Sequence, residues 1–288
     1  MTIWRTIPAV AFILLALFAP LPVGAAARVP WTTSKVQGSP EPPPAYTTER
    51  VYPAVRFQDP VALYFEPLTN WVFVVEHMAK LRVFPNRPAA DRATLAADFT
   101  AITGPGGESY SIAFHPGFAT NRLVFAALLT REPKRSMGVW RMTMKLPASP
   151  EEPPRLETDG AVRLLEWWSD VHNGCDLHFG PDGFLYISAG DGAPPAPPDI
   201  HRTGQSLDDL MSSILRIDVD RPAGGKAYSI PKDNPFVNRP GARPEVWALP
   251  PAGRSTSMRR MEDIRSSSDW PVRWMSGGAG GEPSPAEM

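Results

Sequence analysis

The sequence predicts an all-β fold, an incomplete β-propeller with about three blades, a fragment of a further one and an irregular C-terminal tail. Thirty-five prolines among 288 residues disfavour long helices and suit short strands joined by rigid loops. A strand–turn–strand pattern recurs at a spacing of roughly 50 to 65 residues, the size of a four-stranded blade with loop insertions. With 43% hydrophobic residues and nine tryptophans, the chain has enough apolar material for a sizeable core. A β-sandwich is the competing prediction, but the recurring unit favours the propeller.

Each unit begins with an aromatic-ended strand and a turn, often at proline, continues with an apolar strand and ends with a strand of alternating polarity. The first two strands of the units are expected at 61–67 and 71–76, 111–118 and 123–129, and 176–183 and 184–188, and the third strands at 80–84, 138–142 and 213–219. Residues 243–249 are expected to begin a fourth unit, after which the strand pattern stops.

Composition divides the chain into four segments. Residues 1–27 are predicted to be an export signal, with Arg5 before an apolar run and small residues at 24–27. The apolar run is shorter than the ~20 residues that span a bilayer, which disfavours a membrane anchor. Residues 28–56 are a proline-rich extended lead, 57–249 the propeller part and 250–288 a tail without periodic pattern. We therefore expect a periplasmic or secreted protein without a membrane-spanning segment after cleavage.

Charge and cysteine content narrow the function classes. The net charge of −1 gives no electrostatic reason to expect nucleic acid or an anionic membrane as partner. Cys175 is the only cysteine, so no intramolecular disulfide can form. A small buried hydrophobe is favoured for it over a metal ligand. No set of metal ligands is identified in the sequence.

The stretch from 172 to 192 predicts a strand, a tight turn and a second strand. Pro181 and Gly183 supply the backbone angles of the turn. His172 is expected to open the first strand and Asp191 to end the second, so the hairpin would bring both to one edge of the sheet. An imidazole held by a carboxylate can act as a general base. The alternatives are a hydrogen-bonded loop histidine and an ordinary Gly-Asp-Gly turn.

The motifs of this chain, in their order, resemble the glucose/sorbosone dehydrogenase family. The resemblance rests on His-Asn-Gly-Cys at 172–175, Ala-Phe-His-Pro-Gly-Phe at 113–118, Ile-Leu-Arg-Ile-Asp at 214–218, Ser-Ile-Pro-Lys-Asp-Asn-Pro-Phe at 229–236 and Pro-Glu-Val-Trp-Ala at 244–248. It implies a six-bladed propeller that oxidises an aldose or related sugar with pyrroloquinoline quinone (PQQ) and calcium; the electron acceptor is not identified.

The resemblance also implies roles for individual residues. His172 would be the general base that takes the hydroxyl proton while hydride passes to the quinone, and Asp191 the carboxylate that orients it. Asn173 and Gly174 would allow close approach of a flat cofactor. The family has glycine where this chain has Cys175, and its substrate-binding glutamine has no counterpart around residues 106–108.

Family features that follow the fourth repeat, including the calcium loop and cationic quinone ligands, are not found after Leu249. We interpret this tail as the result of a frameshift or truncation. Two functions are compatible with the sequence: a PQQ-dependent sugar dehydrogenase, and a non-catalytic propeller fragment without cofactor binding. A calcium-dependent lactonase-type propeller is a weaker alternative. His115 and His178 are interpreted as packing or turn residues rather than catalytic ones.

Overall fold

The computed structural model describes residues 49–194, 196 and 200–249. The predicted export signal, the proline-rich lead as far as residue 48 and the predicted tail lie outside these residues. The chain divides into two compact units, residues 1–49 and 50–288, and all the strands below belong to the second. No helix in the described part of the chain is long and apolar enough to cross a membrane.

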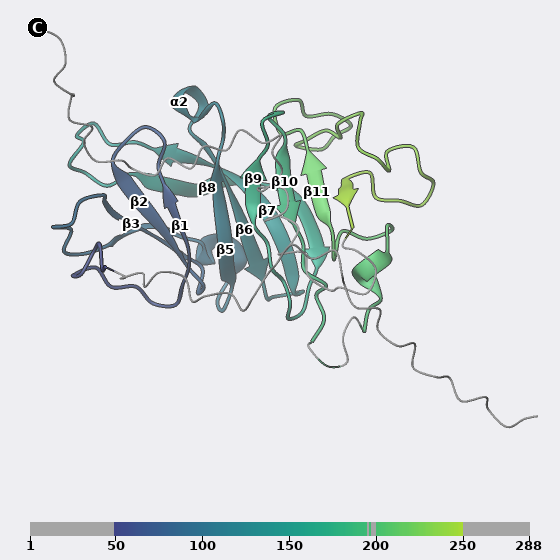
Figure 1. Cartoon of the computed structure of the whole chain (residues 1–288), viewed down its shortest axis with the longest axis horizontal. Helices are drawn as coiled ribbons and strands as arrows, with labels where there is room; N and C mark the ends of the chain where they lie inside the picture. The colour runs from purple at the N-terminus through teal and green to yellow at the C-terminus, as the bar shows by residue number, and fades with distance from the viewer. Residues whose placement is uncertain (1–48, 195, 197–199, 250–288) are drawn as a thin grey trace, which may run out of the picture. The chain divides into compact units, whose positions relative to one another are not determined.

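Three four-stranded antiparallel sheets make up the described fold (Figure 1). The first contains β1 (Pro60–Phe65), β2 (Trp71–Glu76), β3 (Lys80–Pro85) and β4 (Thr94–Asp98); the second contains β5 (Glu108–Phe114), β6 (Leu123–Thr130), β7 (Ser136–Lys145) and β8 (Arg155–Trp168); the third contains β9 (Leu177–Phe179), β10 (Leu185–Ser188), β11 (Ile214–Ile217) and β12 (Val246–Ala248). Short helices α1 (Thr100–Thr103), α2 (Phe118–Asn121) and η3 (Thr203–Gln205) lie in the connections. Each sheet follows chain order, as a propeller blade does. The prediction of an all-β, propeller-like fold with three repeat units is confirmed.

The segment that was expected to begin a fourth unit instead completes the third sheet. β12 pairs antiparallel with β11, with Val246 opposite Leu215 and Ala248 opposite Ile214. Val246 is fully buried in the core of this sheet. The pairing satisfies the backbone groups along the free side of β11, which would otherwise be an open sheet edge.

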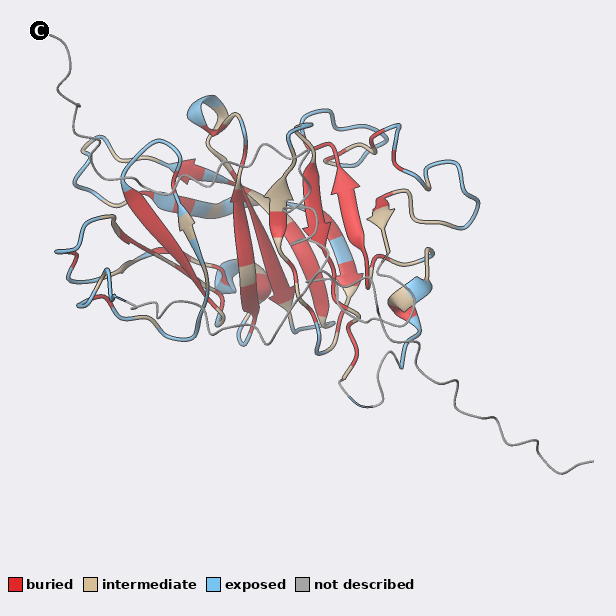
Figure 2. Cartoon of the chain, in the orientation of Figure 1, coloured by how far each residue is buried: buried red, intermediate tan, exposed pale blue. Residues whose placement is uncertain are grey.

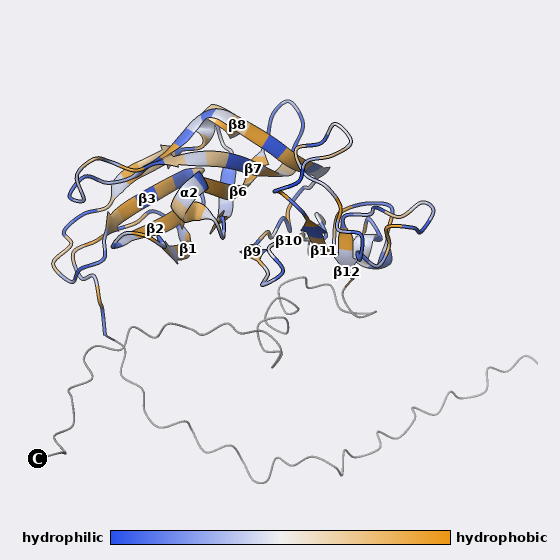
Figure 3. Cartoon of the chain, turned by 90° about the horizontal axis from the view of Figure 1, so that it is seen from above, coloured by the Kyte–Doolittle hydropathy of each residue, from blue (hydrophilic) through white to orange (hydrophobic). Residues whose placement is uncertain are grey.

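The sheets pack through two apolar cores, one between the first and second sheets and one between the second and third. β6 contributes to both, because successive side chains of a strand point to opposite faces. Its Val124, Ala126 and Leu128 join the first core, and Phe125, Ala127 and Leu129 join the second. The strands in the middle of the sheets are therefore buried along most of their length (Figure 2). Orange, hydrophobic colour follows these strands in Figure 3, and blue marks many of the loops.

The first strands of the three sheets are neighbours: β5 lies beside both β1 and β9. The free face of β1 is exposed at Val61, Leu63 and Phe65. The neighbouring β2 residues Val72 and Val74 are covered by the end of the proline-rich lead and by residues near Ala90.

A buried arginine ties the 229–236 loop to the third sheet. The guanidinium of Arg216, on β11, lies between aromatic rings, 4.2 Å from the ring centre of Trp247 and 4.6 Å from that of Phe184. Its Nη1 donates to Asn234 Oδ1 at 3.2 Å. Asn234 Nδ2 donates in turn to the carbonyls of Arg216 (3.0 Å) and Pro244 (2.8 Å). The buried side chain of Asn234 thus connects β11, the 229–236 loop and the segment just before β12.

Glu245 is a second buried charge, immediately before β12. Its side chain is 0% exposed and lies 2.9 Å from Lys226 Nζ, 2.7 Å from the Tyr228 hydroxyl and 3.4 Å from Arg243 Nε. Burial opposes ionisation, but the hydrogen bonds from Lys226 and Tyr228 outweigh it and lower the pKa of Glu245 from 4.5 to about 2.

The stability contributed by ionised Glu245 should be complete above pH 4.5 and decline as the pH falls toward 2, because the folded protein then resists a proton that the unfolded chain takes up. The pKa difference corresponds to about 3 kcal/mol. We expect the Glu245→Gln variant to lose this part of the pH dependence, measured by urea unfolding between pH 2.5 and 6. Glu151→Gln, which removes an exposed carboxylate, is the control. Equal slopes for wild type and Glu245→Gln would contradict the prediction.

Candidate active site

His172 and Asp191 lie in the loops beside the β9–β10 hairpin rather than on its strands. β9 begins at Leu177 and β10 ends at Ser188, so the expectation that His172 opens a strand and Asp191 ends one is wrong. The reason is local: Gly174 has φ 49° and Cys175 φ 148°, values that interrupt a regular strand. The expected turn is present, with a hydrogen bond from Gly183 N to Gly180 O.

The two loops nevertheless run together beyond the hairpin. Gly190 N donates to Asn173 O at 2.9 Å, and Gly192 N donates to His172 O at 3.1 Å. A β-carbon at position 190 would lie 1.9 Å from His172 O, so the loops can approach this closely only with glycine there. Backbone contact therefore brings residues 172 and 191 to the same place.

The side chains of His172 and Asp191 meet there. His172 Nδ1 lies 3.1 Å from Asp191 Oδ1, with the histidine side chain 46% exposed and the aspartate 10% exposed. The same aspartate oxygen accepts a hydrogen bond from Ala193 N at 3.1 Å, which fixes its orientation. A proton on Nδ1 shared with the aspartate leaves Nε2 with a free lone pair. The pair can therefore accept a proton from a molecule at the exposed side of the ring.

Asn173, predicted to contact a cofactor, is 2% exposed and engaged inside the protein. Its Oδ1 accepts from Ser169 Oγ at 2.5 Å, and its Nδ2 donates to the Tyr110 hydroxyl at 2.8 Å. Gly174 has the positive φ that glycine adopts without strain. A cofactor contact from either residue stays a prediction, and at Asn173 the side-chain amide already has protein partners at both ends.

Cys175 has a φ of 148°, a backbone conformation that residues with side chains rarely adopt and that is consistent with the glycine that the sequence resemblance implies at this position. Its carbonyl accepts a hydrogen bond from Ser111 Oγ at 2.9 Å. The thiol is buried in the core between the second and third sheets, and burial, followed by the nearby charge of Asp176, raises its pKa. The interpretation of Cys175 as a small buried hydrophobe is confirmed.

Sequence reasoning did not identify a buried charged group on β5 behind the His172 loop. Glu108 has a side chain 5% exposed and pairs with Arg131, on the β6–β7 connection, and with the hydroxyl of Tyr110. Arg135 lies 3.8 Å from Glu108 and 3.7 Å from Asp170. A glutamate before the apolar residues 112–114 was the available signal, but a strand-end carboxylate usually faces solvent.

The other histidines have their own partners. His115 Nδ1 accepts from Gly117 N at 2.9 Å and lies 2.7 Å from Asn121 Nδ2, which confirms a turn role. His178, on β9, lies 3.0 Å from Asp176 Oδ2. The Nε2 of His115 also lies 3.0 Å from Asp220 Oδ1, so imidazole–carboxylate pairs occur at positions other than His172.

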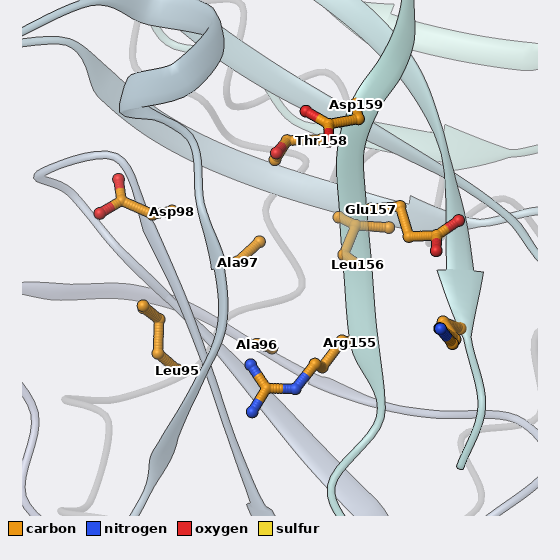
Figure 4. A pocket seen from close by; sticks show the side chains of 10 residues that line it. Leu95, Ala96, Ala97, Asp98, Arg155, Leu156, Glu157, Thr158 and Asp159 are labelled. Carbon is orange, nitrogen blue, oxygen red and sulfur yellow. The ribbon is translucent and has the colours of Figure 1, made fainter.

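A pocket of about 510 Å³ lies elsewhere, between the outer strands β4 and β8 (Figure 4). Leu95, Ala96 and Ala97 line it from β4, and Arg155 and Leu156 line it from β8. Neither His172 nor Asp191 is among its lining residues, so this pocket is separate from the candidate site of proton transfer.

The residues that the structure describes do not fit a calcium ion. Among them, no group of three or more His, Cys, Asp or Glu side chains is arranged to hold a metal. Calcium prefers six to eight oxygen ligands, and two carboxylates of the candidate site are already occupied: Asp191 by the imidazole and Glu108 by arginine. We therefore derive no step through calcium.

Three blade-like antiparallel sheets with an imidazole–carboxylate pair beside one hairpin define a propeller-like protein with a candidate acid–base site. The glucose/sorbosone dehydrogenase family model matches residues 57–250, about two thirds of the sequence. The chain therefore belongs to the glucose/sorbosone dehydrogenase family.

Comparison with individual proteins gives partial matches. The chain is 33% identical to mouse Hedgehog-interacting protein over 162 residues, which cover 54% of this chain and 23% of that protein. It is 41% identical to the HIPL2 protein of Arabidopsis thaliana over 91 residues, or 28% of this chain and 13% of that one. The chain thus spans less than a quarter of the length of either relative.

Among solved structures, a glucose dehydrogenase-type oxidoreductase from Thermus thermophilus is similar, with a TM-score of 0.50 and 24% identity. The superposition covers 67% of this chain and 51% of that one. At this identity the likeness concerns the fold alone.

Proposed function

We propose that this protein takes part in the oxidation of an aldose or related sugar, with His172 as the general base. The observation that carries the proposal is the contact between His172 Nδ1 and Asp191 Oδ1, at 3.1 Å, with the imidazole half exposed. Family membership supports the class of reaction. Asp191 holds the ring with Nδ1 protonated, so that Nε2 can take the proton of a substrate hydroxyl.

The cofactor of the proposed reaction is PQQ, which when bound would accept the hydride from the substrate carbon that bears the deprotonated hydroxyl. Gly174, with its positive φ, would let the backbone approach a flat ligand. The contribution of the described residues is to orient the base and to remove one proton. The proposed setting is outside the cytoplasm, as residues 1–27 predict.

The experiment compares wild type, His172→Gln and His201→Gln after addition of PQQ and calcium, with dye reduction measured for several aldoses. Loss of a positioned general base typically costs a factor of about 10² to 10⁴, so we expect kcat of His172→Gln to fall by that factor. The contact of the His201 ring is with Trp168 rather than with a carboxylate, so its variant removes an imidazole without removing an imidazole–carboxylate pair and should keep wild-type activity. Equal rates for wild type and His172→Gln would contradict the role of the base.

A second candidate function is a non-catalytic propeller domain that binds another molecule. The observation in its favour is the 33% identity to Hedgehog-interacting protein, whose name describes binding rather than oxidation. Titration of the wild-type protein with PQQ, followed by absorbance and tryptophan fluorescence, separates the two functions. Saturable quinone binding supports the dehydrogenase, and its absence at millimolar quinone supports the binding domain.

A further inference from the structure

A chain of hydrogen bonds runs from the His172 loop into the second sheet. Ser169 Oγ donates to Asn173 Oδ1 at 2.5 Å, and Asn173 Nδ2 donates to the Tyr110 hydroxyl at 2.8 Å. The Tyr110 hydroxyl donates to Glu108 Oε2. Each group donates toward the next one on the way to Glu108. The carboxylate at the end can only accept, and this fixes the direction of every hydrogen bond in the chain.

Glu108 can serve as that acceptor because its buried charge is compensated. Arg131 donates to Oε1, Arg135 lies 3.8 Å from the same oxygen, and His77 Nε2 lies 3.3 Å from Oε2. Charged acceptors form stronger hydrogen bonds than neutral ones. Burial and the hydrogen bond to Glu108 raise the pKa of Tyr110, which keeps the hydroxyl protonated as a donor.

The other end of the chain holds the backbone beside the base. Asn173 follows His172 directly, and the carbonyls of these two residues accept from Gly190 N and Gly192 N. Because Gly190 and Gly192 flank Asp191, the position of Asn173 sets the distance between the two halves of the pair. Asn173 is 2% exposed, so its side-chain amide would be buried and unsatisfied if it lost these partners. The cost would favour movement of the loop that carries His172 and Asn173.

We propose that Tyr110 is a positioning residue for His172, which it holds against Asp191 by anchoring Asn173 to the buried carboxylate of Glu108. The role in catalysis rests on the function proposed above, whereas the effect on the His172 ring is a property of the protein alone. Tyr110 and Glu108 thus extend the candidate site from the loops into β5.

The test is the Tyr110→Phe variant, which removes one hydroxyl and keeps the ring. Tyr52→Phe is the matched control, because it removes a tyrosine hydroxyl that is likewise hydrogen-bonded inside the protein: Tyr52 donates to Asn86 Oδ1 at 2.5 Å. The first readout is the nitrogen NMR spectrum of labelled histidine in the protein without added quinone, with His172 assigned by comparison with His172→Gln. The second is hydrogen exchange of the Gly190 and Gly192 amides.

In wild type and Tyr52→Phe, we expect the neutral His172 ring to carry its proton on Nδ1. In Tyr110→Phe, the population should shift toward Nε2–H, and exchange at Gly190 and Gly192 should accelerate about tenfold, the factor that corresponds to one net hydrogen bond. A general loss of stability would not change the tautomer of the folded protein. Glu108→Gln keeps the size of the side chain and should shift both readouts in the same direction as Tyr110→Phe. It takes the place of Tyr110→Phe if the tyrosine variant does not fold.

An unchanged tautomer and unchanged exchange in Tyr110→Phe would overturn the positioning role, whatever the activity of the wild type. If both readouts change while wild type shows no quinone-dependent oxidation, Tyr110 positions the imidazole and the proposed function is wrong. If wild type is active, Tyr110→Phe should lower kcat about tenfold with little change in KM, because the base rather than substrate binding is affected.

Discussion

Replacement of Asn234 by alanine is expected to lower the free energy of unfolding by about 4 kcal/mol. The side chain is buried and makes three hydrogen bonds, two to backbone carbonyls and one from the guanidinium of Arg216. Alanine would leave the carbonyls of Arg216 and Pro244 without this donor, and each buried unsatisfied group costs about 1–3 kcal/mol. Urea unfolding at neutral pH measures the change.

Asn238→Ala provides the control, because Asn238 lies in the same connection and is exposed. Its variant should unfold within about 0.5 kcal/mol of wild type, as exposed substitutions usually do. Equal destabilisation by the two substitutions would show that the loop, rather than the Asn234 hydrogen bonds, sets the cost. Asn234→Asp should also destabilise, because a carboxylate oxygen would face two carbonyl oxygens.

The Asn234 contacts give a physical account of a motif that the sequence marks only by resemblance. Ser-Ile-Pro-Lys-Asp-Asn-Pro-Phe at 229–236 has no periodicity that predicts a structure. In the structure, Ser229 forms a two-way backbone bridge with Asp218, and Asn234 joins three backbone segments. The motif works through hydrogen bonds to distant carbonyls, which no local pattern can indicate.

The parts of the fold that were predicted from sequence are those whose burial leaves a pattern. β2 and β6 are apolar along their length because both faces are covered, and β11 was recognised in the alternating segment 213–219. The outer strands β4 and β8 were not predicted. β8 mixes exposed and buried residues over Arg155–Trp168 without a regular period, and its register with β7 shifts twice.

The pairing of residues 243–249 shows the same limit. Their apolar residues predicted a strand correctly, but not the partner of that strand. Whether a strand begins a new sheet or completes the preceding one depends on which edge is free, and the free edge here belongs to β11, about thirty residues earlier in the chain.

At the candidate site, the approach of His172 to Asp191 was predictable because a hairpin brings its ends together. The backbone conformation of the two loops was not predictable, since nothing in the residue type of Cys175 indicates a positive φ. Tyr110 and Glu108 were missed because they lie more than 60 residues before the histidine and reach it only when β5 packs against the third sheet.

Gly190→Ala should move the loop that carries Asp191 away from the loop that carries His172. In the observed backbone, the added methyl group would lie 1.9 Å from His172 O and 2.8 Å from Asn173 O. Both contacts are with backbone, which cannot rotate away, so the two loops must move apart. We expect a loss of about 3 kcal/mol in the free energy of unfolding and loss of the Nδ1–H tautomer of His172 in the NMR spectrum.

Gly241→Ala separates this steric effect from the general cost of replacing glycine. Gly241 has φ 78° and no atom within 4 Å of the added carbon. The free energy of unfolding of its variant should fall by only about 1–2 kcal/mol, the cost of a residue with a β-carbon in the left-handed region. The His172 spectrum should stay as in wild type, because the added carbon at position 241 has no atom within 4 Å to displace. If Gly190→Ala keeps the wild-type tautomer, the close approach of the loops is not what holds the imidazole against Asp191, and the hydrogen bonds through Asn173 must do so alone.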